Sequence, residues 1–321
     1  MSINDAFKDF QQTVNANIEE VREARRRRDL FKTSFGGLSD VDEVVPSGSL
    51  ARGTQKDPIH DVDLVIVYSA SDHPGWGQPG DSAEEALDYT RAKVNELLGI
   101  TNGTDARVVR LARWRNHAVK CFFDDESEQN PFTVDAMPAL RFGDHFLVPE
   151  ATSNAWIECD PEYLIALVAG RHGEWDKFAG SVRMLKRWAA DQDTKIKSLV
   201  MEVLALEHIP RSVENQPSAI KQFFVAAAYA LEGGERVKDP ANLCGDIQAD
   251  LDYSALAVRL RGAADEAEAA IQAQINNDLY SAYVHWGKVF GSSFPKPPAG
   301  LAPLPAVVPA APRKVKDTPQ G

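Results

Sequence analysis

An apolar, β-branched run at residues 63–68 constrains the fold of this chain more than any other feature. Its sequence, DLVIVY, is the near-continuous hydrophobic run expected of a central strand that is buried on both faces. Two carboxylates, Asp61 and Asp63, stand at its start, and residues two apart on a strand point to the same face. Carboxylates this close repel each other unless a positive charge lies between them. We therefore expect Mg2+ here, which takes hard oxygen ligands from one or two carboxylates and from substrate phosphates.

A third carboxylate, Asp135, lies within the β-prone run at residues 132–137. An unpaired charge in an otherwise apolar strand would be costly. If this strand lies beside residues 63–68, Asp135 completes a cluster of three carboxylates with Asp61 and Asp63. Such a cluster could hold two Mg2+ ions roughly 3.5–4 Å apart, which would activate an attacking hydroxyl and stabilise a leaving phosphate.

A turn of small residues, PSGSLARGT, precedes the carboxylate pair. Gly48 allows close approach of the backbone to a ligand, and Ser49 offers a hydroxyl and an N–H group. A helix that begins near Ser49 would add an anion site at its N-terminus. Arg52, Gly53 and Thr54 would continue this phosphate cradle. Each feature alone has an ordinary explanation, such as a strand cap or a plain turn, but the combination and its spacing are typical of nucleotidyl transfer.

The periodicity divides the chain into two folded halves, which predicts an α+β fold. One long helix is expected over residues 3–28, opened by a capping box of Ser2 with Asp5 and carrying an apolar stripe. The stripe consists of Ile3, Phe7, Phe10, Val14, Ile18 and Val21. Strands are then expected at residues 41–45, 63–68, 107–114, 118–124 and 132–137, with a helix at residues 82–98. From about residue 155 helices dominate, at 161–170, 174–191, 195–207, 217–231, 253–274 and 277–290.

We therefore expect three parts: residues 1–155 as the N-terminal helix and catalytic lobe, 156–294 as a helical lobe, and 295–321 as a disordered tail. The tail prediction rests on its proline- and alanine-rich composition without any amphipathic period. No apolar run approaches the roughly 20 residues needed to span a bilayer, so no membrane is expected as a partner. The polar, charged N-terminus does not resemble a secretory signal, which predicts an intracellular protein.

The charge and cysteine content argue against other classes of site. With 47 acidic and 35 basic residues the formal net charge is −12, which disfavours nucleic acid as a partner. One basic run, Arg25 to Arg28, is either a solvated helix end or a polyanion site. The three cysteines are far apart and show no C-x-x-C signature, and the seven histidines form no closely spaced pair. A disulfide framework and a structural zinc are therefore not expected.

The stretch GSLARGTQKDPIHDVDL resembles the G-S…R-G-T…D-x-D signature of polymerase-β-like nucleotidyltransferases, and most closely the bacterial CD-NTases. These are relatives of cyclic GMP-AMP synthase and of 2′-5′-oligoadenylate synthetase. The stretches MLKRWAADQDTKIKSLVMEVLAL and HWGKVFGSSFP resemble further segments of that family. The resemblance covers most of residues 1–295, and it implies a sheet-bearing catalytic lobe and a helical lobe bridged by the long N-terminal helix. Nucleotides would lie in the cleft between the lobes.

The resemblance implies roles for individual residues. The donor triphosphate would be bound by Gly48 and Ser49, with Lys186, Lys197 and Ser198 contributing from the helical half. Two Mg2+ ions, or Mn2+ in their place, would be held by Asp61, Asp63 and Asp135, and Asp135 would act as the general base or orient it. Trp286 and Phe290 would be packing residues.

The resemblance also implies the biological setting. The enzyme would join two or three NTPs into a cyclic oligonucleotide and release pyrophosphate, in bacterial antiphage signalling (CBASS) in the cytoplasm. ATP, GTP or pyrimidine NTPs would be the substrates, and the product would act on an effector protein. In some such systems an E1/E2-like ligase conjugates the cyclase through its C-terminal residue, which suggests Gly321 as a conjugation point; a tail without a role is the alternative.

Three other functions stay open at this point. An RNA-directed nucleotidyltransferase, such as a CCA-adding enzyme, shares the same core motif, although the acidic balance of the chain argues against RNA binding. A transferase that modifies a protein or a small molecule would release no cyclic product from NTPs alone. A non-catalytic module with a degenerate site is disfavoured because the three acids and the Gly-Ser pair are all present.

Overall fold

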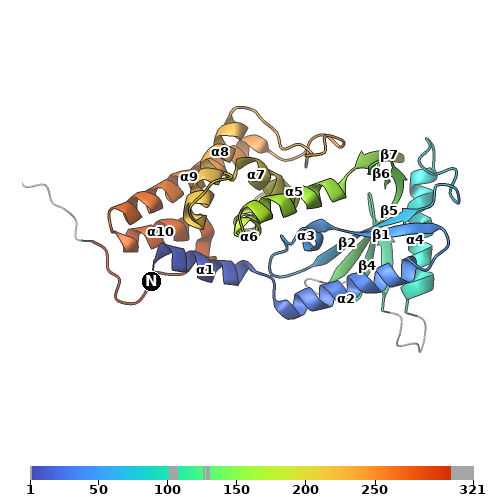
Figure 1. The fold of residues 1–321 in the computed structure, drawn as a ribbon, viewed down its shortest axis with the longest axis horizontal. Helices are drawn as coiled ribbons and strands as arrows, with labels where there is room; N and C mark the ends of the chain where they lie inside the picture. The colour runs from blue at the N-terminus through green and yellow to red at the C-terminus, as the bar shows by residue number, and fades with distance from the viewer. Residues whose placement is uncertain (1, 101–107, 126, 128–130, 305–321) are drawn as a thin grey trace, which may run out of the picture.

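The computed structural model describes residues 2–100, 108–125, 127 and 131–304, which form two lobes (Figure 1). One lobe contains a mixed β-sheet with helices α2 and α4, and the other is built from helices α5 to α10 together with α1. The predicted α+β class is confirmed. Within the described residues, no helix combines the length and the apolar character needed to cross a membrane.

The sheet places the two predicted acidic strands side by side. Its order is β1-β2-β5-β4-β3, with β6 paired to the far end of β5 and β7 paired to β6. Strands β2 and β5 are parallel, whereas every other pairing is antiparallel. The strands are β1 (Val41–Ser47), β2 (Asp61–Tyr68), β3 (Leu111–Trp114), β4 (Val119–Phe122), β5 (Thr133–Phe142), β6 (His145–Glu150) and β7 (Ala155–Cys159). Strands β6 and β7 were not predicted, and with them the sheet continues beyond residue 155, where helices were expected to begin.

The two faces of the sheet are covered differently. Helices α2 (Ile18–Phe35) and α4 (Ser82–Leu98) pack on the same face, against the side chains of Leu64 and Ile66. Val65 and Val67 point to the opposite face, where they join a smaller apolar cluster with residues of β5 and β6. Because side chains alternate along a strand, Asp61 and Asp63 belong to this second face, which α2 and α4 leave free.

The prediction of one continuous N-terminal helix is wrong. Helix α1 (Ile3–Val14) and helix α2 are separate, and the break lies at Asn15. The predicted capping box of Ser2 and Asp5 is confirmed at the start of α1. Asn15 leaves the helix because its backbone pairs with Lys56 and its side chain accepts a hydrogen bond from Arg183. Asparagine competes well for such non-helical contacts.

The break assigns the apolar stripe to two different cores. Ile3, Phe7, Phe10 and Val14 pack into the helical lobe, whereas Val21 packs against the sheet with the rest of α2. Ile18, predicted to lie on the stripe, is 65% exposed. The N-terminal segment therefore connects the lobes through a bend at residues 15–17 instead of through a rigid rod.

The basic run lies in the middle of α2, so its interpretation as a helix end is wrong. Arg26 pairs with Glu23, and Arg28 pairs with Asp29. The guanidinium of Arg27 lies over the rings of Phe123 and Phe132, 4.5 and 4.1 Å from their centroids. Three of the four arginines thus have partners within the chain, while Arg25 and Arg28 line a cavity together, so the alternative of a polyanion site stays a prediction.

Six helices complete the second lobe, close to the six predicted segments. They are α5 (Pro161–Glu174), α6 (Phe178–Ala190), α7 (Ser198–His208), α8 (Gln216–Glu232), α9 (Tyr253–Ile275) and α10 (Leu279–Phe290). Trp286 and Phe290 are buried, and both rings pack against Phe7 of α1. They are packing residues, as expected.

The predicted tail is described only at its beginning. Residues 295–304 contain no helix or strand, and Leu301 packs against the helical core. Residues 305–321, including the suggested conjugation point Gly321, lie outside the described residues, so that suggestion stays a prediction.

Candidate active site

The sheet aligns two of the three predicted carboxylates. In the parallel pairing of β2 with β5, Asp63 lies directly opposite Asp135, and Asp61 lies opposite Thr133. These residues belong to a row that crosses four neighbouring strands. Ser47 of β1 is the partner of Asp63, and Lys120 of β4 is the partner of Asp135. The sequence predicted a carboxylate cluster only if these two strands were neighbours, and in the structure they are. The cluster lies at the sheet edge where α3 (Gly48–Ala51) begins.

The electrostatics of this row are those of crowded carboxylates. Burial, together with the charges of Asp61 and Asp135, raises the pKa of Asp63 to about 7. Burial also raises the pKa of Asp135, although Lys120, whose Nζ lies 3.7 Å from Oδ1 of Asp135, acts in the opposite direction. The positive side chains near this edge thus do not balance the negative charge of its carboxylates.

A divalent cation fits this donor set. Oδ1 of Asp135 is buried and accepts no hydrogen bond from the described residues. A cation at this edge would offset the like-charge repulsion that raises the pKa of Asp63. In the described part of the chain, no group of three His, Cys, Asp or Glu side chains forms a ready metal cage. The three predicted carboxylates are therefore not assembled here as a complete ligand set, and Mg2+ would need one or two of them together with substrate phosphates and water.

Gly48 is required by the position of Asp63. Its φ angle is +69°, in the left-handed region that favours glycine, and a Cβ atom there would lie 1.7 Å from Oδ2 of Asp63. The turn therefore packs its backbone directly against the catalytic candidate. Helix α3 itself has only four residues, so the predicted contribution of a helix N-terminus to anion binding is not supported.

A cavity of about 180 Å3 lies beside the carboxylates and gathers predicted residues from four elements. Ser49 comes from α3, Asp61 from β2, Lys186 from α6, and Ser198 from the first turn of α7. Gln55, Lys56, Pro58, Ile59 and His60 complete the lining. Lys197 does not line this cavity: its side chain is exposed, and its backbone N–H donates to Gln248.

Lys56 is a cavity residue that the sequence analysis did not assign. It is half-buried, and burial and then Arg187 lower the pKa of its ammonium group. A desolvated cation at a cavity wall attracts anions more strongly than a solvated one. The signal was available, because Lys56 is the only lysine or arginine between the R-G-T motif and the aspartate pair.

Arg52 and Thr54 do not line the cavity. Nε of Arg52 donates to Oε2 of Glu202 over 2.6 Å, and the hydroxyl of the fully buried Thr54 donates to the same oxygen over 2.9 Å. Lys186 also pairs with Glu202. The predicted cradle role of Arg52 and Thr54 is therefore replaced by a contact with α7, and Glu202 is a residue that sequence reasoning missed. Its only signal was a lone carboxylate within the apolar stretch LVMEVLAL.

A pH-dependent stability follows from the pKa of Asp63. Its folded-state value of about 7 lies above the value of about 3.9 expected for an unfolded chain, so the folded state binds more protons between them. With metal removed by EDTA, stability from this group should fall as pH rises from about 4 to about 7, by up to ~4 kcal/mol. Urea unfolding at several pH values checks this. Asp63→Asn should remove that fall and be more stable than the wild type at about pH 8; identical pH profiles would contradict the assignment.

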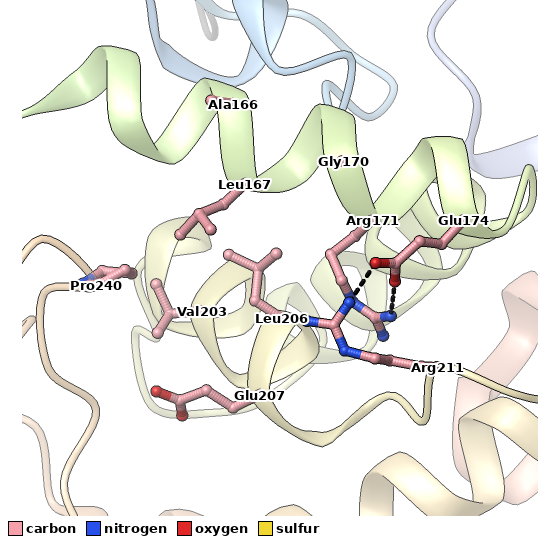
Figure 2. Close-up of a pocket in the computed structure, with 10 residues that line it drawn as sticks. All are labelled: Ala166, Leu167, Gly170, Arg171, Glu174, Val203, Leu206, Glu207, Arg211 and Pro240. Carbon is pink, nitrogen blue, oxygen red and sulfur yellow. Dashed lines mark hydrogen bonds and ion pairs between the residues drawn. The ribbon is translucent and has the colours of Figure 1, made fainter.

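A larger cavity lies elsewhere, between α5 and α7 (Figure 2). Its volume is about 400 Å3, and Leu167, Val203 and Leu206 form its apolar wall. Glu174 pairs with Arg171 and Arg211 at one end, as the dashed lines in Figure 2 show. None of the predicted site residues lines it. The candidate active site is therefore the sheet edge with the carboxylates, together with the smaller cavity beside it, because the predicted acidic, hydroxyl and lysine side chains lie there.

Comparisons with known proteins show what the whole chain is similar to. No family model matches the chain. A probable cyclic nucleotide synthase of Bacillus cereus is 22% identical over 334 aligned positions, covering 91% of this chain and 97% of that protein. The cyclic AMP-AMP-AMP synthase of Escherichia coli is 24% identical and covers 86% of this chain and 91% of that protein.

Solved structures agree on the fold. Escherichia coli CdnC with ATP superposes with a TM-score of 0.70 at 20% identity, over 92% of this chain and 99% of that one. The CD-NTase CdnG of Bradyrhizobium diazoefficiens with GTP gives a TM-score of 0.64 at 12% identity, over 88% and 96% of the two chains. The resemblance to CD-NTases and the predicted fold are confirmed, and the predicted enzyme class agrees with the synthases among the relatives. The chain has the CD-NTase fold and is related over nearly its whole length to cyclic nucleotide synthases.

Proposed function

We propose that this chain is a Mg2+-dependent nucleotidyltransferase that joins two or three NTPs into a cyclic oligonucleotide and releases pyrophosphate. The observation that supports it most is the pairing of Asp63 with Asp135 on parallel strands, beside a cavity that contains Ser49, Lys56 and Ser198. Acidic residues next to a cationic cavity are what a metal-assisted transfer from a triphosphate needs. The relatives support the same reaction, because both are named as synthases of cyclic nucleotides.

The cavity is the proposed site of the donor triphosphate. The hydroxyl groups of Ser49 and Ser198 can donate to phosphate oxygens, and Lys56 and Lys186 supply positive charge at the wall. ATP or GTP is the proposed donor, since solved relatives contain one or the other. The proposed roles of Lys197 and of the side chains of Arg52 and Thr54 as direct ligands lose support, because these groups do not line the cavity.

Asp61, Asp63 and Asp135 are the proposed ligands of Mg2+ or Mn2+. A bound divalent ion would lower the pKa of the acceptor ribose hydroxyl and offset the charge of the leaving pyrophosphate. Asp135 accepts the proton of that hydroxyl or orients the group that does, and its raised pKa makes it a better proton acceptor. The hydroxyl oxygen bonds to the α-phosphorus, and the bond from that phosphorus to the β-phosphate oxygen breaks. One further transfer of the same kind closes a ring of two nucleotides and two further transfers close a ring of three, with one pyrophosphate released each time.

We place this activity in the bacterial cytoplasm, in antiphage signalling, with an effector protein that responds to the product. One solved relative, Escherichia coli CdnC, is in complex with a HORMA protein, so protein partners occur among chains of this fold. For this chain we retain the proposal of an E1/E2-like ligase that acts at Gly321.

The product assay tests the proposed function. Purified protein is incubated with Mg2+ and all four NTPs, the mixture is treated with phosphatase, and the products are analysed by mass spectrometry. We expect a phosphatase-resistant cyclic oligonucleotide, whose mass identifies the bases and the ring size. Extension of an RNA primer, or transfer of a nucleotide to a protein, without any cyclic product would support the alternative transferases and contradict the proposal.

A further inference from the structure

A buried ionic cluster joins the two lobes directly behind the proposed donor cavity. We call it the interlobe clamp, and it consists of Arg52, Thr54, Lys186 and Glu202. Arg52 and Thr54 belong to the segment between α3 and β2 in the sheet lobe, whereas Lys186 and Glu202 lie on α6 and α7 of the helical lobe. Figure 1 shows α3 at the junction where the sheet meets the helices.

Glu202 is the centre of the clamp. One of its oxygens, Oε2, accepts hydrogen bonds from Nε of Arg52 and from Oγ1 of Thr54, at 2.6 and 2.9 Å. The other oxygen, Oε1, accepts from Nη2 of Arg52 at 3.1 Å and pairs with Lys186. The carboxylate is 1% exposed, yet Lys186 and Arg52 outweigh the effect of burial and lower its pKa to about 2. Glu202 is therefore a fixed negative charge that holds two cations from different lobes.

Lys186 connects the clamp to the cavity. It is 3% exposed, and besides Glu202 its Nζ donates to the carbonyl of Thr54 at 3.1 Å and reaches the hydroxyl of Thr54 at 3.3 Å. The same side chain lines the cavity with Ser49 and Ser198. The three N–H groups of its ammonium thus have partners inside the clamp, so the direction of Lys186 at the cavity wall is set by Glu202 and Thr54.

The clamp also holds the turn that contacts the carboxylates. The backbone N–H of Thr54 donates to the carbonyl of Ser49 at 3.0 Å, which closes the segment from Gly48 to Thr54. Nη1 of Arg183 adds a second contact from α6, to the carbonyl of Gly53 at 2.7 Å. Displacing Arg52 or Thr54 from Glu202 therefore moves Ser49 relative to Ser198 on the opposite lobe.

The charge balance of the clamp points to an anion in front of it. Two cations share one carboxylate, so the buried cluster keeps a net positive charge, and Lys56 adds another at the cavity wall. Well-packed apolar residues are often as good for stability as a buried ion cluster, so the clamp is weak evidence for a purely stabilising role. Asp61 also lines the cavity and Arg52 acts on the charge of Asp63, so these carboxylates offset part of the excess. A polyanionic ligand would be attracted to Lys56 and Lys186.

We propose that Glu202 is a positioning residue of the donor site, which holds Arg52, Thr54 and Lys186 so that both lobes face one nucleoside triphosphate. This rests on the proposed function, because the triphosphate is its donor substrate. Glu202 does not touch the ligand in this role; it fixes Lys186 at the cavity wall and, through Arg52 and Thr54, the turn that carries Ser49. Removing its charge should weaken binding of the triphosphate, even though the cavity then becomes more positive.

The test compares Glu202→Gln with Glu207→Gln, the same change five residues later on α7. Glu207 lines the separate cavity of Figure 2 and has no part in the clamp. Arg52→Lys is a second variant, which keeps the charge but loses the two-pronged contact with the carboxylate, in case Glu202→Gln does not fold. Titration calorimetry measures the Kd of the α,β-methylene analogue of ATP, and of GTP, with Mg2+. The product assay measures KM and kcat, and thermal unfolding measures Tm.

We expect Glu202→Gln to raise the Kd and KM by about tenfold or more, and Arg52→Lys to raise them several-fold, since a charge-assisted hydrogen bond is worth about tenfold in binding. Glu207→Gln should match the wild type. A smaller folded fraction lowers the apparent kcat but leaves KM unchanged, so a merely structural role predicts a lower Tm with unchanged KM and Kd. That result, or tighter binding by Glu202→Gln, overturns the inference.

The two proposals fail in different ways. If the wild type binds the analogue but makes no cyclic product, the proposed function falls while the Kd values still decide the role of Glu202. If the wild type binds neither analogue, both proposals fall together.

Discussion

Replacing Asp61 and Asp63 together by alanine is expected to abolish formation of the cyclic product, with a fall in rate of at least about 1,000-fold. Both carboxylates lie on the sheet face that α2 and α4 leave free, and Asp63 is the direct neighbour of Asp135 across the parallel strands. Without them, Asp135 alone remains to hold a divalent cation. Mass spectrometry of phosphatase-treated reactions, with wild-type protein in parallel, measures the effect.

The fold of this double variant should survive. Asp61 and Asp63 stand at the entrance of β2, and their removal relieves repulsion instead of breaking a stabilising contact. Circular dichroism and the unfolding midpoint should therefore equal or exceed those of the wild type. Asp144→Ala is the matched control, because Asp144 is 99% exposed at the turn between β5 and β6 and should leave activity unchanged. Retained activity in the double variant would refute the catalytic assignment.

Replacing Gly48 by alanine is expected to lower activity by about 100-fold or more, because an added Cβ would overlap the Asp63 carboxylate. The Cβ would lie 1.7 Å from Oδ2 and 2.5 Å from Cγ of Asp63, so either the turn or the carboxylate must move. The left-handed backbone adds roughly 1–2 kcal/mol of strain for any residue with a side chain. Steady-state kinetics of product formation measures the loss.

A second glycine distinguishes the effect of the overlap with Asp63 from the effect of backbone strain. Gly143 also has a positive φ angle, +63°, but no atom lies within 4 Å of where its Cβ would be. Gly143→Ala should therefore show the backbone strain as a modest loss of stability while keeping wild-type activity. If Gly48→Ala behaves like Gly143→Ala, the close approach of the turn to Asp63 is not required for catalysis.

Local patterns predicted most of the elements because their signals lie within short stretches of chain. The near-continuous, β-branched apolar run at residues 63–68 predicted strand β2, and the helical period over residues 82–98 coincides with α4, which ends before Gly99. Strands β6 and β7 were missed because Pro149 interrupts the first and the second is short and half-exposed. The break in the N-terminal helix was missed because the apolar stripe continues through Asn15, whose partners Lys56 and Arg183 are remote in sequence.

The site residues also divide into those that local sequence patterns predict and those that only tertiary contacts reveal. Residue type and spacing alone predicted the aspartate pair and the glycine turn, because those groups lie within one strand or one turn, whereas only the pairing of β2 with β5 placed Asp135 beside Asp63. Only the tertiary structure decided which cations face the cavity and which are held inside the protein. Arg52 and Thr54 pair with Glu202, about 150 positions further along the chain, and this contact depends on how two lobes meet. Side chains that meet across an interface between lobes leave no periodic signal in the sequence, whereas side chains that share a strand do.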